Sequence, residues 1–113
     1  MGDVNKLKIW QMSKNLSVSL YREIRTNKLI QSYSRFKSQL TNCVVSITAN
    51  IAEGDESNTL KQSMNYFYYA KVYCAELITY LIIAKELNMI KGEKIDMFLK
   101  QAELISIFLY KII

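Results

Sequence analysis

The chain has 113 residues, of which half are hydrophobic, three are glycine and none is proline. So few turn-forming residues argue against a β-rich fold, because hairpins depend on them, and we expect a single all-α domain over residues 1–113. The formal net charge is +5 and histidine is absent, which excludes Ser-His-Asp and Cys-His nucleophile systems and most zinc sites.

The positive charge belongs to the first half of the chain. Residues 1–52 carry eight Lys or Arg against two acids, whereas residues 53–113 carry seven Lys against eight acids. This asymmetry permits nucleic-acid binding. Cys43 and Cys74 occupy apolar helical positions and are expected to be buried free thiols. With no apolar leader and no long uncharged apolar run, we expect a cytoplasmic protein that does not cross a membrane.

Residues 5–26 have the spacing of a first helix, with Asp3 or Asn5 as the expected N-cap. Its broad apolar arc consists of Ile9, Trp10, Leu16, Leu20, Tyr21 and Ile24. Four cations lie on the opposite side: Lys8, Lys14, Arg22 and Arg25. A helix face that is merely solvated does not need side chains of a single charge sign. Two interpretations therefore remain open: the four cations contact phosphates, or they form a simple solvated face.

Residues 26–32 are expected to be a connection with Lys28 at its tip, followed by a second helix over 33–53 with three faces. The core arc is Phe36, Leu40, Cys43, Val44, Ile47 and Ile51. A polar row runs beside it: Arg35, Gln39, Asn42, Ser46, Asn50 and Glu53. The remaining residues are small or β-branched, which favours close contact with another helix. Gly54 is expected to end the helix by adopting φ > 0.

The polar row has two interpretations. Gln39, Ser46, Asn50 and Glu53 set helix register or hold a partner, or they simply hydrogen-bond within the subunit or its interface. Both remain open at this point.

A third helix is expected over 58–87, because Thr59 to Gln62 matches a capping box. One apolar arc consists of Leu60, Met64, Phe67, Cys74, Ile78 and Leu81, and a second of Tyr66, Tyr69, Val72, Tyr73, Tyr80 and Ile83. A small bundle cannot easily cover both arcs, so Tyr66, Tyr69, Tyr73, Tyr80 and Ile83 are expected to contact another subunit. A base-stacking platform for single strands is the rival interpretation.

A turn over 88–93, with Asn88 as a candidate C-cap, leads to a fourth helix over 93–111. Its core face is expected to be Ile95, Phe98, Leu99, Ala102, Ile105, Leu109 and Ile112. Short links between four helices favour an antiparallel up-down-up-down four-helix bundle.

The chain also resembles a known bacterial family, the four-helix-bundle proteins encoded in intervening sequences of 23S ribosomal RNA genes. Relatives of that family include the accessory variability determinant of diversity-generating retroelements. The residues that carry the resemblance are Leu7, Trp10, Tyr21, Gln39, Ser46, the block Asn50-Ile51-Ala52-Glu53-Gly54, Phe67, Ala70, Glu76-Leu77 and the stretch 84–90.

The resemblance implies a four-helix bundle assembled as a ring, typically a homopentamer. For the retroelement branch it implies a non-enzymatic partner of a reverse transcriptase with a basic surface for RNA or DNA. The chain departs from the family in having Thr41 and Asn42 where two arginines are frequent, and Val72 and Tyr73 where Gly-Ser is frequent. The first departure leaves Arg35 and Lys37 as the cations of the second helix.

Two functional hypotheses follow, and neither needs a cofactor, a metal or a catalytic residue. The first is a nucleic-acid-binding accessory protein that contacts phosphates through Lys8, Lys14, Arg22, Arg25, Lys28, Arg35 and Lys37. The second is an oligomeric protein–protein scaffold without a nucleic-acid role. An enzyme is the least favoured class, because no phosphate loop or paired-carboxylate spacing is present.

Overall fold

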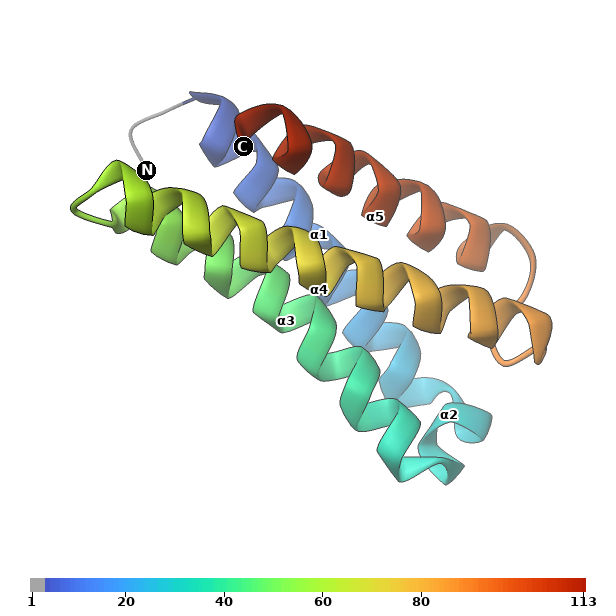
Figure 1. Cartoon of the computed structure of the whole chain (residues 1–113). Coiled ribbons are helices and arrows are strands. Elements are labelled where there is room, and N and C mark those ends of the chain that lie inside the picture. Colours follow the sequence, from blue (N-terminus) through green and yellow to red (C-terminus); the bar gives the residue numbers. More distant parts are fainter. Residues whose placement is uncertain (1–3) are drawn as a thin grey trace.

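The computed structural model describes residues 4–113, and within that range the chain forms helices joined by short links (Figure 1). The helices are α1 (Val4–Thr26), α2 (Lys28–Ser32), α3 (Ser34–Glu56), α4 (Leu60–Glu86) and α5 (Gly92–Ile112). The all-α expectation is confirmed. The four long helices begin and end within three residues of the predicted bounds, while Asp3, one of the two candidate caps of the first helix, lies outside the described residues.

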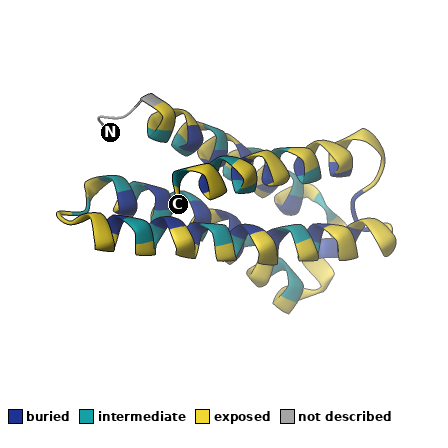
Figure 2. Cartoon of the chain, turned by 45° about the horizontal axis from the view of Figure 1, so that its top comes forward, coloured by how far each residue is buried: buried dark blue, intermediate teal, exposed yellow. Residues whose placement is uncertain are grey.

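The four long helices enclose one hydrophobic core. α3 packs on α1 and α4, and α5 packs on α1 and α4. α1 reaches α4 through the Lys6 side chain, whose Nζ lies 5.3 Å from the centroid of the Phe67 ring. The resulting helical bundle measures 43 × 24 × 19 Å. Figure 2 shows buried residues on the inward sides of all four helices and exposed residues on the outside.

The core is built from the residues that the helical spacing indicates. α1 contributes Ile9, Leu16, Leu20 and Ile24, and Phe67 of α4 is fully buried. Tyr21, which was assigned to the same arc of α1, is instead 53% exposed. Leu60 was also assigned to a core arc, but it is the first residue of α4 and its side chain is exposed at the end of the bundle.

Cys43 and Cys74 are free, fully buried thiols, as expected. Burial raises the pKa of Cys74 to about 12. The pKa of Cys43 also rises to about 12, first through burial and then through Glu76, whose carboxylate accepts a hydrogen bond from the Cys43 Sγ at 3.5 Å. Both thiols are therefore protonated at neutral pH and unreactive while the protein is folded.

The connection predicted over 26–32 is wrong in part, because it contains the short helix α2. Asn27 begins this helix as its N-cap, with its Oδ1 accepting from the Ile30 backbone N–H at 3.0 Å. Ile30 is fully buried and anchors α2 against the core. A five-residue helix has too little periodicity for the sequence alone to reveal it.

Gly54 does not end the second long helix. α3 continues through Gly54 to Glu56, and the positive φ angles among the described residues belong to Asn88 and Gly92. Gly54 is buried against α4: a Cβ added there would lie 2.8 Å from Cε1 of Phe67. The glycine is thus required for close helix packing and not for a left-handed turn. The Ser63 Oγ donates to the Gly54 carbonyl at 2.6 Å, a hydrogen bond that joins the start of α4 to α3.

Two other helix ends have the capping residues that the sequence predicts. The Thr59 Oγ1 accepts from the Gln62 backbone N–H at 3.2 Å and caps α4. Asn88 has φ 56°, and the next residue, Met89, donates its N–H to the Ala84 carbonyl at 2.8 Å. This is the pattern of a left-handed helix stop.

Candidate nucleic-acid interface

The seven predicted phosphate contacts do not all line one groove. Six of them are exposed: Lys8, Lys14, Arg22, Arg25, Lys28 and Arg35. Lys37 is half-buried. Four of the seven line three different grooves between helices, and one groove brings two of them together.

That groove lies between α1 and α3, next to α2, with a volume of about 680 Å³. Arg25 from α1 and Lys37 from α3 line it, together with Tyr21. The other residues around it are Ile24, Gln31, Ser38, Thr41, Asn42 and Val45. The lining contains no Asp or Glu, so no acid within the groove offsets the two cations. Lys14 precedes Tyr21 by seven residues, about two turns, and so lies on the same side of α1.

A second groove brings Lys8 beside Lys111, a cation that the sequence interpretation did not include. It lies between α1 and α5, and its walls also contain Phe108 and Ile112. The Lys111 Nζ lies 5.9 Å from the centroid of the Phe108 ring. The clue in the sequence was weak, because Lys111 is the last cation of a helix with three Lys and three acids, whose net charge is zero.

Arg35 lies in a third place, a hollow between the start of α3 and α4. Tyr33, Gln39 and Tyr80 share this hollow with it. Lys14, Arg22 and Lys28 line none of these three grooves.

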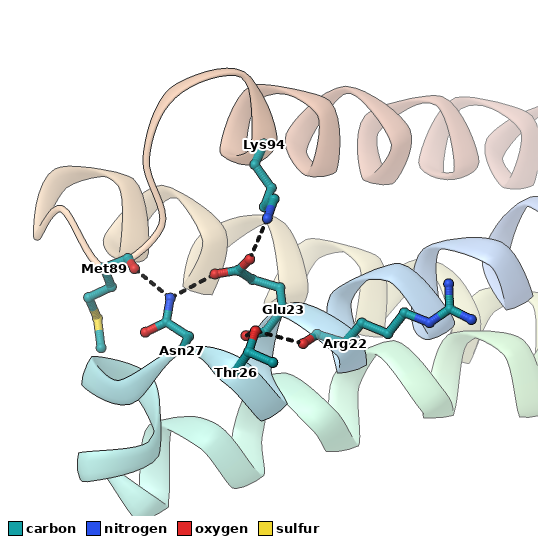
Figure 3. Close-up of polar contacts among 6 residues, drawn as sticks. All are labelled: Arg22, Glu23, Thr26, Asn27, Met89 and Lys94. Atoms are coloured by element: carbon teal, nitrogen blue, oxygen red, sulfur yellow. Dashed lines mark hydrogen bonds and ion pairs between the residues drawn. The ribbon is translucent and has the colours of Figure 1, made fainter.

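The one acid in residues 4–26, Glu23, is turned away from the α1–α3 groove. Its two carboxylate oxygens accept from the Lys94 Nζ at 2.9 Å and from the Asn27 Nδ2 at 2.8 Å. Figure 3 shows this cluster beside the α4–α5 turn, with the Arg22 side chain pointing away from it. Asn27 Nδ2 also donates to the Met89 carbonyl at 2.7 Å, which ties α1 to that turn. Glu23 therefore does not neutralise the exposed cations of α1.

The residues of the polar row of α3 differ in how far their side chains are buried. Gln39 and Glu53 are exposed, whereas Ser46 and Asn50 are half-buried. Asn50 donates its Nδ2 to the Ser46 carbonyl at 2.8 Å, one turn earlier in the same helix. These contacts agree with hydrogen bonding inside the subunit and leave the outer edge of the row open to a partner.

The outer surface of α4 is unusually apolar for a chain in water. Tyr69 and Ile83 of the predicted interface are exposed, as are Tyr68, Val72 and Ile82. The other three interface residues, Tyr66, Tyr73 and Tyr80, are half-buried. The ring of Tyr80 meets that of Phe36 edge to face with centroids 5.8 Å apart, so Tyr80 contributes to packing between α3 and α4 within the chain.

In the described part of the chain, α4 is the one helix whose length and composition alone would allow it to cross a membrane. A core helix meets the same criteria, and 33% of its most apolar window is buried inside the bundle. One face of α4 is therefore packed in the core of the bundle.

Comparison with known proteins places the chain in a family. The family model of the 23S rRNA-intervening sequence protein matches residues 5–111. The chain belongs to this family. The expectation drawn from the residues at the start of α1, from the Asn50–Gly54 block and from α4 is thereby confirmed, whereas a link to retroelements is not shown by this match.

The fold of the chain also has a solved counterpart. A crystal structure from Bacteroides thetaiotaomicron, described as a protein of unknown function from the S23 ribosomal protein family, superimposes with a TM-score of 0.82. The alignment covers 96% of this chain and 97% of the other, at 18% sequence identity. Similarity at that level establishes the shared helical fold. No curated protein matches the sequence.

Proposed function

We propose that this protein is a non-enzymatic accessory protein that binds RNA or DNA through the exposed cations of its N-terminal half. The observation that carries the proposal is the α1–α3 groove, where Arg25 and Lys37 converge without any acid in the lining. Counterion release from a phosphate backbone gives such a surface affinity without sequence readout. A reverse transcriptase of a diversity-generating retroelement is the protein partner that we propose for it, on the strength of the family resemblance.

The proposal includes assembly. We propose that the four long helices form an antiparallel up-down-up-down bundle and that copies close into a ring-like homo-oligomer, a homopentamer, in the cytoplasm. The exposed apolar face of α4, which contains Tyr69, Val72 and Ile83, supports this assembly. We assign that face to other copies and not to lipid, because the opposite face, with Phe67 and Leu81, is fully buried in the core. A ring would bring several copies of a modest basic surface onto one nucleic acid.

The experiment is a binding titration with labelled RNA and DNA at low and moderate salt. Replacing Lys14, Arg22 and Arg25 together with Gln should weaken binding, and the log–log salt slope should fall by about 0.7–0.9 for each phosphate that the variant no longer binds. The matched control removes three exposed cations that lie outside α1: Lys61, Lys91 and Lys100. Unchanged affinity in the α1 variant would end this assignment of residues.

A second function is favoured by one observation, the apolar outer face of α4. An oligomeric protein–protein scaffold without a nucleic-acid role would use this face and the exposed edge of the α3 polar row, and would leave the cations solvated. An intact ring that binds neither RNA nor DNA at low salt would select this alternative.

A further inference from the structure

The α1–α3 groove contains aromatic and hydrogen-bonding side chains in addition to its cations. Nine residues from three helices line it, and besides two cations they supply an aromatic ring, two amides and two hydroxyls. Tyr21 is 53% exposed at this groove although its neighbour Leu20 is fully buried. Cations are sufficient to bind phosphates. The exposed ring of Tyr21 therefore indicates that the ligand has a second kind of group, one that packs against an aromatic ring.

Lys37 is held in place over the groove. The Gln31 Oε1 accepts from the Lys37 Nζ at 3.0 Å, while the Gln31 Nε2 donates to the Ile24 carbonyl at 2.7 Å. Gln31 thus links the end of α1 to Lys37 and uses both ends of its amide to do so. An ammonium group that is already oriented loses less side-chain entropy when it binds an anion.

The apolar part of the groove lies beside the cations. Tyr21 and Arg25 are one turn apart on α1, so the ring and the guanidinium share one side of that helix. Val45, which is 52% exposed, adds an apolar side chain from α3, and the exposed amide of Asn42 offers both a donor and an acceptor. An aromatic face, flanking cations and an amide together match the base, the phosphates and the hydrogen-bonding edge of one nucleotide.

We propose that this groove binds an unpaired nucleotide of a single-stranded RNA or DNA segment, with the base against Tyr21 and the adjacent phosphates on Arg25 and Lys37. The inference rests on the proposed nucleic-acid function and narrows it to single strands. In a duplex the faces of each base are covered by stacked neighbours, so Tyr21 has nothing to contact. The groove, at about 680 Å³, is within the usual range of roughly 300–1,000 Å³ for small-ligand pockets.

The test compares labelled oligouridine, oligothymidine and a hairpin duplex of equal length by fluorescence anisotropy at moderate salt. Tyr21→Ala should weaken binding of the single strands roughly tenfold, and Tyr21→Phe, which keeps the ring, should bind them nearly as well as the wild type. Neither variant should change duplex binding. Tyr110→Ala is the matched control, because Tyr110 is 72% exposed on α5, outside both the groove and the apolar face of α4. Circular dichroism checks that each variant folds.

A second pair of variants tests the cation. Lys37→Gln and Lys28→Gln remove the same charge, but only Lys37 lines the groove. Lys37→Gln should weaken single-strand binding several-fold more than Lys28→Gln does. Tight binding of either the RNA or the DNA strand supports the inference, and the tighter of the two identifies the ligand.

The outcomes separate this inference from the function on which it rests. If Tyr21→Ala behaves like Tyr110→Ala, or weakens duplex and single strands equally, the nucleotide site is overturned while salt-dependent binding by the basic surface stands. If no nucleic acid binds even at low salt, the proposed function fails and the nucleotide site fails with it.

Discussion

Replacing Gly54 with alanine should destabilise the protein, although alanine is the better helix former. Helix propensity alone would stabilise α3 by about 1 kcal/mol. The new Cβ, however, would lie 2.8 Å from Cε1 and 3.0 Å from Cδ1 and Cζ of the fully buried Phe67. Forcing an extra methyl group into such a core costs about 1–3 kcal/mol. The expected net effect is a loss of about 1 kcal/mol in the free energy of unfolding, or about 4 °C in Tm.

The assay is urea unfolding followed by circular dichroism, carried out as a double-mutant cycle with Phe67→Leu. The smaller leucine side chain makes room for the methyl group, so Gly54→Ala should be less destabilising, or even stabilising, in that background. The coupling between the two sites is the quantity that reports the contact. If Gly54→Ala raises stability by about the helix-propensity value in both backgrounds, the close packing of α3 on α4 at this point is refuted.

Three further predictions concern other parts of the molecule. Asn27→Ala removes the cap of α2 and the hydrogen bonds to Glu23 and Met89, and should lower the free energy of unfolding by about 2 kcal/mol in the same urea assay. Burial raises the pKa of Cys74 from 9.0 to about 12, so its contribution to stability is complete below pH 9 and is lost as pH rises through 12; the stability of the wild type relative to Cys74→Ala should fall across that window. Tyr69→Lys places a charge on the exposed face of α4 and should shift the sedimentation coefficient from the oligomer towards the 13.2 kDa monomer.

Each of these predictions has a result that contradicts it. An Asn27→Ala variant as stable as the wild type would show that α2 and the α4–α5 turn are held by other contacts. A constant stability difference from pH 9 to 12 would mean that the Cys74 thiol titrates normally in the folded state. An unchanged sedimentation coefficient for Tyr69→Lys would place the oligomer interface elsewhere.

Helical spacing was sufficient to predict the long helices and most of the core, because a buried face at every third or fourth residue is a signal carried by the whole helix. It was insufficient at Gly54, since a glycine near a helix end has two explanations, a positive φ or a close packing contact. The distinction depends on Phe67, which is 13 residues further along the chain. The short helix α2 was missed because a single buried residue, Ile30, anchors it.

The candidate site was predicted only as a set of cations. Their grouping depends on how the helices are placed side by side, so the convergence of Arg25 and Lys37 could not be derived from either helix alone. Tyr21 was assigned to the core because its spacing fits the apolar arc of α1. Its position one turn before Arg25 was the available hint that it lies at the edge of that arc.

The most direct test of the account is the salt dependence of nucleic-acid binding by the wild-type protein. The account predicts measurable binding of single-stranded RNA or DNA at low salt, with the logarithm of affinity falling linearly against the logarithm of salt concentration by about 0.7 per phosphate contacted. Absence of binding at low salt, or an affinity that does not change with salt, would contradict it.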